Sequence, residues 1–565
     1  MIQLPADVLY LVCEELSKLA DFNTLFHCAL ASKALGKPAL LWMYRIHNQS
    51  TIISSEGNDA DLTRNATFEG RLDAQKITLF KWMLLWKSII RSSLGSKTTA
   101  YPYCLYIRSL DLRNLAELLE ELPFRSAQDE FFSDDMKQFL RQVPMTLKMR
   151  GSKGSNKRLD IPMILELVGE SITSYVSHSA SMNHATVALE DISGIIGTMA
   201  LAAWTARLSK LKSMTLWDGA VLDQSVAEAI SANCFDFDDL TFFTCLKGDV
   251  DHNIASFFSG LRSNTLKSFT ALIAHALGPE TLLSLNNHSQ SLKRLKLDGL
   301  RSATVKNLSL LQGCVALEAI ELTDADGTVD LEVPENDIFL EVIAWLSNCN
   351  GLQELLLSRF VSGPKILTQV CLKNNIRLKK LKVVDYPLAG NQDFHRALSH
   401  QTSLESLELR ADPETAFRDD IDVLVSSVSA LKSLKYLDLL STSDYFSTTE
   451  ILTLAEHLPL LEEIFFSGYD VTDALWPGVS RLPNLRSLNI HAVTSFSFNA
   501  ILDYVSTLQD TNRGLLLSIM NQKPENAMSE RHERAIRQAI KNEVDGKFEF
   551  TLFREPDSES DMLSD

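Results

Sequence analysis

The chain has 565 residues, of which 45% are apolar and 22% charged, a balance typical of a folded protein rather than a disordered one. Its formal net charge of −18 at pH 7 argues against binding to nucleic acid, because phosphates would be repelled unless basic residues were segregated. The eight cysteines are scattered without a C-x-x-C pair, and the sequence suggests neither a secretory leader nor an apolar stretch of about 20 residues, so we expect a cytoplasmic or nuclear protein that enters no membrane.

Residues 1–46 predict a small module of three short helices. The first helix follows Leu4 and Pro5, and side chains of Asp21 and Ser32 are placed to cap the second and third. Apolar residues of the first helix recur at helical spacing, at Val8, Leu9, Val12, Cys13 and Leu16. Because so short a segment has room for only a small core, we expect some of these residues to contact another protein. Residues 47–103 are predicted to be a helical linker.

From residue 104 onward, one apolar phrase recurs. It consists of an apolar residue, two variable positions, a second apolar residue, one variable position and a third apolar residue, as in Leu211, Met214 and Leu216. Eleven copies begin at 211, 237, 266, 292, 317, 352, 378, 404, 434, 461 and 485. A period near 26 residues indicates stacked units, because one such unit cannot bury its own apolar edge.

Each phrase predicts a strand whose second and third apolar residues point inward, and an apolar helical pattern comes about ten residues later. This alternation resembles the leucine-rich repeat of the longer intracellular type. The resemblance implies an α/β solenoid over residues 104–520, with parallel strands on the concave face and helices on the convex face. We expect a C-terminal helix and cap over residues 521–553, and an acidic disordered tail over residues 554–565.

Three units carry a cysteine three residues before the phrase, namely Cys234, Cys314 and Cys349. This placement resembles the cysteine-containing subclass of the repeat, in which a small apolar residue fills the turn from helix to strand. Cysteine as a metal ligand or nucleophile is the alternative. The recurrence of the position once per repeat favours the core interpretation.

The N-terminal module resembles an F-box, in the form found in fungal F-box proteins. The resemblance is carried by Leu4-Pro5 with the first helix, by residues 25–33, and by residues 41–45. Residues 82–91 and 103–112 are similar to the segment after the F-box in those proteins. It implies docking on the Skp adaptor of an SCF complex, a cullin–RING ubiquitin ligase whose substrate is held by the repeats. The residues expected to contact the adaptor are Leu4, Pro5, Val8, Leu9, Val12 and Leu16.

Outward positions of the predicted strands supply candidates for binding a protein substrate. Trp217 and Phe243 occupy equivalent positions on neighbouring strands, and exposed aromatic residues side by side are plausible binding anchors. Two pairs of basic residues face outward on an otherwise acidic protein and suggest an acidic or phosphorylated substrate. These residues are Arg294 with Lys296, and Lys380 with Lys382.

Two other classes of function remain as alternatives. An enzyme is not favoured, because the sequence contains no GxSxG, HExxH or Walker motif, and we predict no catalytic residue, cofactor site or metal site. A leucine-rich-repeat scaffold without a ubiquitin role would use the N-terminal helices as a cap of the array. A cap should present a polar outer face, whereas Val8, Leu9 and Val12 are apolar, and this favours the F-box interpretation.

Overall fold

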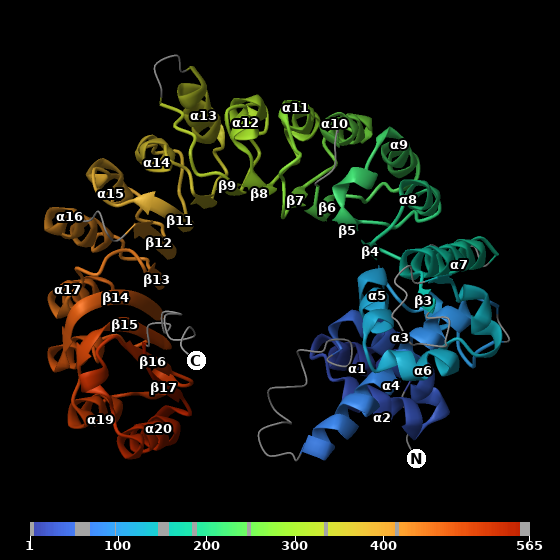
Figure 1. Ribbon diagram of the computed structural model, residues 1–565, viewed down its shortest axis with the longest axis horizontal. Coiled ribbons are helices and arrows are strands. Elements are labelled where there is room, and N and C mark those ends of the chain that lie inside the picture. The colour runs from blue at the N-terminus through green and yellow to red at the C-terminus, as the bar shows by residue number, and fades with distance from the viewer. Residues whose placement is uncertain are drawn as a thin grey trace, which may run out of the picture. The chain divides into compact units, whose positions relative to one another are not determined.

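The computed structural model of the chain describes residues 5–50, 68–95, 98–144, 157–182, 189–245, 250–332, 337–412 and 417–553. The chain forms two compact units, Met1–Leu272 and Ile273–Asp565, and each is described by itself. In each unit the strands line one side and the helices cover the other (Figure 1). The fold is that of a leucine-rich-repeat solenoid.

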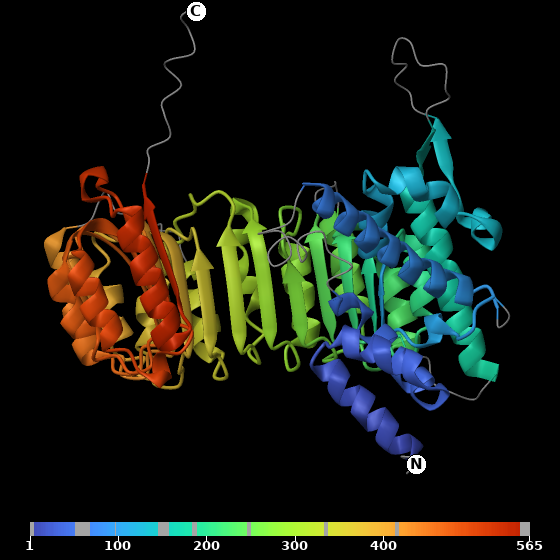
Figure 2. The same cartoon turned by 90° about the horizontal axis from the view of Figure 1, so that it is seen from below.

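The N-terminal module consists of α1 (Ala6–Lys18), α2 (Phe22–Ala31) and α3 (Lys33–Arg45). The predicted caps are present, since the Asp21 carboxylate accepts a hydrogen bond from the backbone N–H of Thr24, and the Ser32 hydroxyl accepts one from that of Leu35. The core of the module is small and is formed by Cys13, Leu25 and Ala39, all fully buried. The N-terminal end of helix α1, at the dark blue end of the chain, projects beyond the other two helices, whereas Cys13 nearer its C-terminal end packs against them (Figure 2).

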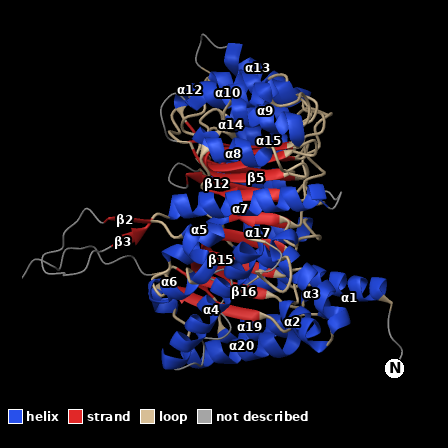
Figure 3. Cartoon of the chain, turned by 90° about the vertical axis from the view of Figure 1, so that its right-hand side faces the viewer, coloured by secondary structure: helices blue, strands red, loops and turns tan. Residues whose placement is uncertain are grey.

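Unit 1 continues with repeats whose strands are parallel and follow the order β1-β4-β5-β6-β7. Strands β2 (Gln142–Pro144) and β3 (Lys157–Leu159) form an antiparallel pair that stands apart from these repeats (Figure 3). The strands of the repeats are β1 (Ser109–Asp111), β4 (Asp191–Gly194), β5 (Ser213–Asp218), β6 (Asp239–Thr244) and β7 (Ser268–Ala271). The helices are α4 (Phe68–Ser92), α5 (Leu112–Glu120), α6 (Phe124–Phe131), α7 (Ile161–Met182), α8 (Thr198–Thr205), α9 (Gln224–Asn233) and α10 (Val250–Gly260).

Unit 2 contains consecutive parallel strands, each paired with the next along the chain. They are β8 (Arg294–Leu300), β9 (Ala319–Asp324), β10 (Glu354–Ser358), β11 (Lys380–Pro387), β12 (Ser406–Asp412), β13 (Tyr436–Leu439), β14 (Glu463–Thr472), β15 (Ser487–Ser495), β16 (Leu516–Asn521) and β17 (Lys547–Leu552). The helices are α11 (Pro279–Ser284), α12 (Ser302–Val305), α13 (Asp337–Asn348), α14 (Gly363–Cys371), α15 (Gln392–Leu398), α16 (Arg418–Val428), α17 (Thr448–His457), α18 (Trp476–Val479), α19 (Phe498–Ser506) and α20 (Glu530–Val544). The strand series extends to Leu552, within the segment where the sequence predicts a helix and cap.

The strands lie where the apolar phrase predicts them. Each of the eleven begins two residues after the start of its phrase, and the inward residues are buried, as Met214 and Leu216 illustrate on β5. The apolar positions of neighbouring strands are in register, so that Leu355 on β10 lies beside Ile320 on β9 and Leu381 on β11. The register shifts beyond these positions, near the C-terminal ends of β8, β11 and β14. Neighbouring repeats therefore build one continuous row of apolar side chains.

The cysteines before the strands are core residues, as their recurrence predicts. Cys234, Cys314 and Cys349 are buried, and the Cys234 thiol contacts the carbonyl oxygens of Thr205 and Leu208 in the preceding repeat at 3.3 Å. The Cys349 thiol contacts the Cys314 carbonyl oxygen at 3.6 Å. Burial raises the pKa of each of the three thiols to about 12, which disfavours the thiolate that a nucleophile or metal ligand requires.

These thiols should make stability depend on pH in the alkaline range. The unfolded chain releases their protons near pH 9 while the folded chain keeps them up to about pH 12, so the free energy of unfolding should fall between those values. Replacing Cys349 by Ala removes one such group and should make the decline less steep by about 1.4 kcal/mol per pH unit. Urea unfolding at several alkaline pH values measures both slopes, and equal slopes would contradict this assignment.

Candidate protein-interaction surfaces

The first surface is the outer face of the N-terminal module. On α1, Val8 and Val12 share a face with Leu19, which follows the helix, while Cys13 and Ser17 point to the core. The side chain of Val12 is 44% exposed, and Leu19 is 77% exposed. An apolar stripe that points away from the core of its own module has the character of a docking surface.

The residues expected to contact the adaptor lie on α1 or directly before it and differ in exposure. Leu4 lies outside the described residues, Pro5 is exposed at the start of α1, and Val8 and Leu9 are half-buried. Leu16 packs against the module core, which is a structural role by itself. The exposure of four apolar residues was not foreseen from the sequence: Leu11 on α1, Leu19 directly after it, and Phe26 and Leu30 on α2. The four-residue spacing of Phe26 and Leu30 was the available signal, since it places both on one face of α2.

The module is packed onto the start of the repeats. The Tyr44 ring stacks on the Tyr103 ring at 4.6 Å between centroids, and the Tyr44 hydroxyl forms a 2.7 Å hydrogen bond with that of Ser88. Burial raises the pKa of Tyr44 to about 12 and lowers that of His47, whose Nδ1 lies 2.8 Å from the Tyr44 carbonyl oxygen. Buried and hydrogen-bonded groups of this kind hold the module in one orientation within unit 1.

A second buried polar cluster joins α4 to the first repeat. The Asn114 side-chain oxygen, on α5, accepts hydrogen bonds from the indole N–H groups of Trp82 and Trp86, both at 2.8 Å. All three side chains are buried. One amide therefore satisfies two aromatic donors that would otherwise be buried without an acceptor.

Replacing Asn114 by Leu should destabilise unit 1. The change leaves two buried indole N–H groups without this acceptor, and each unsatisfied donor costs about 1–3 kcal/mol. Urea unfolding followed by tryptophan fluorescence measures the loss. Asn374→Leu, at an exposed position in unit 2, is the matched control and should change the unfolding free energy by less than about 0.5 kcal/mol. Equal decreases in the unfolding free energy of the two variants would show that the hydrogen bonds of Asn114 do not stabilise the fold.

The second surface lies on the strand side of unit 1. Trp217 on β5 and Phe243 on β6 stack with their ring centroids 5.5 Å apart, and the Trp217 side chain is 49% exposed. The repeat period predicts these two residues side by side, and the structure confirms it. The guanidinium of Arg113 lies over the Phe243 ring, 5.5 Å from its centroid, and forms an ion pair with Asp111 at 3.2 Å.

Apolar and small polar residues surround this aromatic pair. Ile195 follows β4 as Trp217 follows Leu216, and it is 45% exposed. Farther along the strands lies Asp191, whose carboxylate accepts hydrogen bonds from the hydroxyls of Ser109, Ser193 and Ser213 at 2.6–3.2 Å. The strand face of unit 1 is therefore built from hydroxyls, aspartates and an aromatic edge.

The strand face of unit 2 is charged, but its charges are paired. Lys296 forms an ion pair with Glu321 at 2.6 Å, and Lys382 forms one with Glu408 at 2.9 Å. In both cases the partner comes from the next strand. Arg294 and Lys380 are exposed at the starts of β8 and β11. Of the four basic residues proposed for an acidic substrate, two are thus already neutralised by neighbouring glutamates.

Ion pairs between adjacent strands, which together form an ion-pair ladder, continue to β12 and β13. Arg410 bridges Glu408 at 3.0 Å and Asp438 at 3.2 Å, and the Asp438 side chain is almost fully buried. Burial raises the pKa of Asp438, against the opposing effects of its backbone hydrogen bond and of Arg410. Because each carboxylate faces a guanidinium or ammonium group, this ladder is close to neutral and serves to hold adjacent repeats in register.

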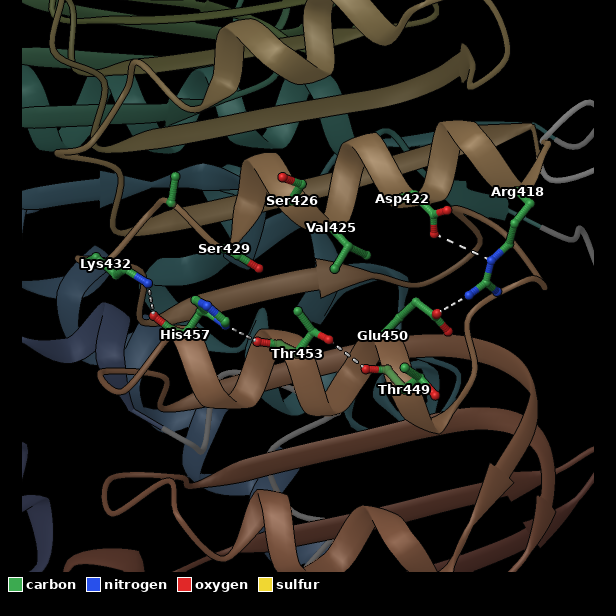
Figure 4. Close-up of a pocket in the computed structure, with 11 residues that line it drawn as sticks. Arg418, Asp422, Val425, Ser426, Ser429, Lys432, Thr449, Glu450, Thr453 and His457 are labelled. Carbon is green, nitrogen blue, oxygen red and sulfur yellow. Dashed lines mark hydrogen bonds and ion pairs between the residues drawn. The ribbon is translucent and has the colours of Figure 1, made fainter.

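A groove of about 640 Å³ lies on the helix side of unit 2, between α16 and α17. Arg418 closes one end through ion pairs with Asp422 and Glu450, and at the other end Lys432 donates a hydrogen bond to the His457 carbonyl oxygen (Figure 4). Its remaining wall consists of serine and threonine hydroxyl groups with Val425 and Ala430. The charged groups at both ends bond to residues of the groove itself, so they are not available to a ligand, and of the wall hydroxyls that of Ser429 is buried without a hydrogen-bond partner among the described residues.

Within the described residues, no group of three histidine, cysteine, aspartate or glutamate side chains is placed to hold a metal ion. None of the helices described is both long enough and apolar enough to cross a membrane.

The chain is similar to several solved structures of other proteins. No family model and no curated protein matches the chain. A structure of the yeast Rad7 and Elc1 complex matches with a TM-score of 0.37 and 13% identity, covering 82% of this chain and 94% of that one. A TLR13–ssRNA13 complex matches with a TM-score of 0.31 and 13% identity over 59% of this chain and 56% of that one. The leucine-rich-repeat protein LegL7 from Legionella pneumophila matches with a TM-score of 0.30 and 10% identity over 52% and 90%. We therefore base the proposed function on the surfaces of this chain alone.

Proposed function

We propose that this protein is the substrate-recognition subunit of an SCF-type cullin–RING ubiquitin ligase. The N-terminal module would dock on the Skp adaptor, and the repeats would hold a protein substrate in the cytoplasm or nucleus. The chain itself would contribute no catalytic residue or cofactor, because ubiquitin transfer would be carried out by the partners. The observation that carries this proposal is the apolar outer face of the module, together with the F-box resemblance of the same residues.

The exposed apolar residues of the module are better suited to docking on an adaptor than to forming the terminal cap of the solenoid. Val12 on α1 and Leu19 directly after it form one exposed stripe, and Phe26 and Leu30 on α2 form a second. A terminal cap of a solenoid needs a polar outer face to remain in solution, and these stripes are the opposite. Buried anchors of this kind typically cost on the order of 2 kcal/mol or more of binding energy when truncated.

The packing of the module onto the repeats supports the same role. The Tyr44–Tyr103 stack and the hydrogen bond between the Tyr44 and Ser88 hydroxyls fix the module against α4 and the segment before the first repeat of unit 1. A ligase subunit must hold a substrate at a defined distance from the site of transfer, and a rigid connection provides that distance. A scaffold without a ubiquitin role would not require a rigid connection, because a flexible tether would serve it equally well. The rigid connection therefore favours the interpretation as a ligase subunit.

The double variant Val12→Asp with Phe26→Asp should abolish adaptor binding without unfolding the repeats. Both side chains are about half exposed, so the charges cost little in the free protein but would be buried unpaired in the complex. Affinity for the purified Skp adaptor, measured by calorimetry, should fall at least about thirtyfold. Leu122→Asp is the matched control, because Leu122 is exposed on unit 1 beyond the module.

Binding of the adaptor at unchanged affinity by the double variant would show that this face is not the interface. Failure of the unaltered chain to bind adaptor or cullin at all would leave the scaffold interpretation, in which the module has a different partner.

A further inference from the structure

We propose that the aromatic edge of unit 1 binds an arginine-rich segment of the protein substrate, seated over Trp217. The inference rests on the proposed function and deepens it, because it names the chemistry of the substrate. It departs from the acidic or phosphorylated substrate that the lysine pairs suggest.

The aromatic pair already holds one guanidinium. Arg113 lies over the Phe243 ring at 5.5 Å, within the range of about 6 Å at which a cation and a ring attract each other. The Trp217 ring stacks on Phe243 and remains half exposed. Tryptophan has the most favourable face for a cation among the aromatic residues. A second guanidinium, supplied by a partner, can therefore extend the stack on the Trp217 side.

The strand face beside this pair carries acidic side chains at its outward positions. The outward positions of the five strands of unit 1 hold three aspartates and no lysine or arginine, as the sequence of these strands shows. Asp111 is paired with Arg113 from the adjoining helix, and the others are Asp191 and Asp239. Asp191 is hydrogen-bonded by three serine hydroxyls, which are neutral, and its carboxylate forms no ion pair within the described part of the chain. A cationic segment would be attracted to this face, and an acidic one would be repelled.

Two of the four candidate basic residues of unit 2, by contrast, are already engaged, while Arg294 and Lys380 are exposed. Lys296 and Lys382 are paired with Glu321 and Glu408, so an acidic ligand would have to displace a carboxylate at each position. No such exchange is needed on unit 1, where the exposed face of Trp217 is apolar and open. Electrostatic complementarity therefore favours the basic ligand on unit 1 over the acidic ligand on unit 2.

The dimensions suit a short extended peptide. Ile195, Trp217, Phe243 and Leu272 occupy equivalent positions at the ends of four adjacent strands, and three strand spacings amount to roughly 14 Å. An extended chain advances roughly 3.3 Å per residue, so about four residues cross this row. An arginine among these peptide residues can place its guanidinium on Trp217, while apolar residues beside it in the peptide contact Ile195 or Leu272.

The test uses the full chain without any adaptor and four labelled octapeptides, in which glycine alternates with arginine, lysine, glutamate or phosphoserine. Fluorescence anisotropy should show tightest binding of the arginine peptide and weaker binding of the lysine peptide, since guanidinium stacks better than ammonium. Binding should weaken as the salt concentration rises. Trp217→Ala should lower the affinity for the arginine peptide at least about tenfold, and Asp191→Asn should lower it about threefold.

Two matched controls separate this site from general effects. Tyr469 is an aromatic residue of unit 2 with the same exposed fraction as Trp217, 49%, so Tyr469→Ala should leave the affinity unchanged. Asp326, also in unit 2, is likewise hydrogen-bonded by a serine hydroxyl, so Asp326→Asn should leave the affinity unchanged. Thermal melts of each variant show whether the fold is retained, and Trp217→Phe, which keeps a ring, should retain part of the binding.

Substitution of Arg113 tests whether the ligand carries positive or negative charge. Removing its positive charge with Arg113→Ala should leave binding of the arginine peptide unchanged or tighter, because a like charge and a competitor for Phe243 are lost. Tighter binding of the glutamate or phosphoserine peptide, weakened by Arg113→Ala or Lys380→Ala, would overturn the proposal in favour of an acidic substrate. An arginine peptide that binds equally well to Trp217→Ala would also overturn it. Neither result concerns the adaptor, so failure here is distinct from failure of the module to bind Skp.

Discussion

The structure depends on the pairing of each strand with the strands of the two neighbouring repeats. A single repeat contributes one short strand and one short helix, which together leave an apolar edge uncovered. In unit 2 the register of β9, β10 and β11 brings Leu355 beside Ile320 and Leu381, so each leucine completes the core of the repeat next to it. The buried thiols of Cys314 and Cys349 act at the same joints, where a larger side chain would separate the repeats. Stability is thus shared along the array, and a weak repeat is supported by its neighbours.

This same pairing explains why the fold could be predicted from the sequence. A regular period fixes both the strand position and the inward side chains, so eleven strands and the buried residues of their phrases follow from the phrase alone. The side-by-side placement of Trp217 and Phe243 followed from the same count, since the two residues are separated by one period. Strands in less regular segments were harder to predict. Strand β17 was not foreseen, because its repeat contains the longer helix α20 instead of the usual short helix.

The candidate surfaces were less predictable, because exposure and charge pairing are properties of the packed chain. Sequence spacing showed that α1 is apolar but not which of its stripes is turned outward, and Leu16 proved to be part of the core while Leu19 is exposed. The pairing of Lys296 with Glu321 and of Lys382 with Glu408 was present in the sequence, since the partners are 25 and 26 residues apart. Aligning the repeats on one another, rather than reading each strand by itself, would have revealed it.

The stack of Tyr44 on Tyr103 has a consequence for how defects in this protein would appear. These rings touch neither the outer stripes of the module nor the aromatic edge near Trp217, yet they set the angle between the two within unit 1. In the proposed ligase complex, a change at this joint would leave each partner bound with normal strength while moving the captured protein out of reach of the transferring group. Such a variant would be silent in every binding measurement and would be recognised only by slower turnover of the captured protein in the assembled complex.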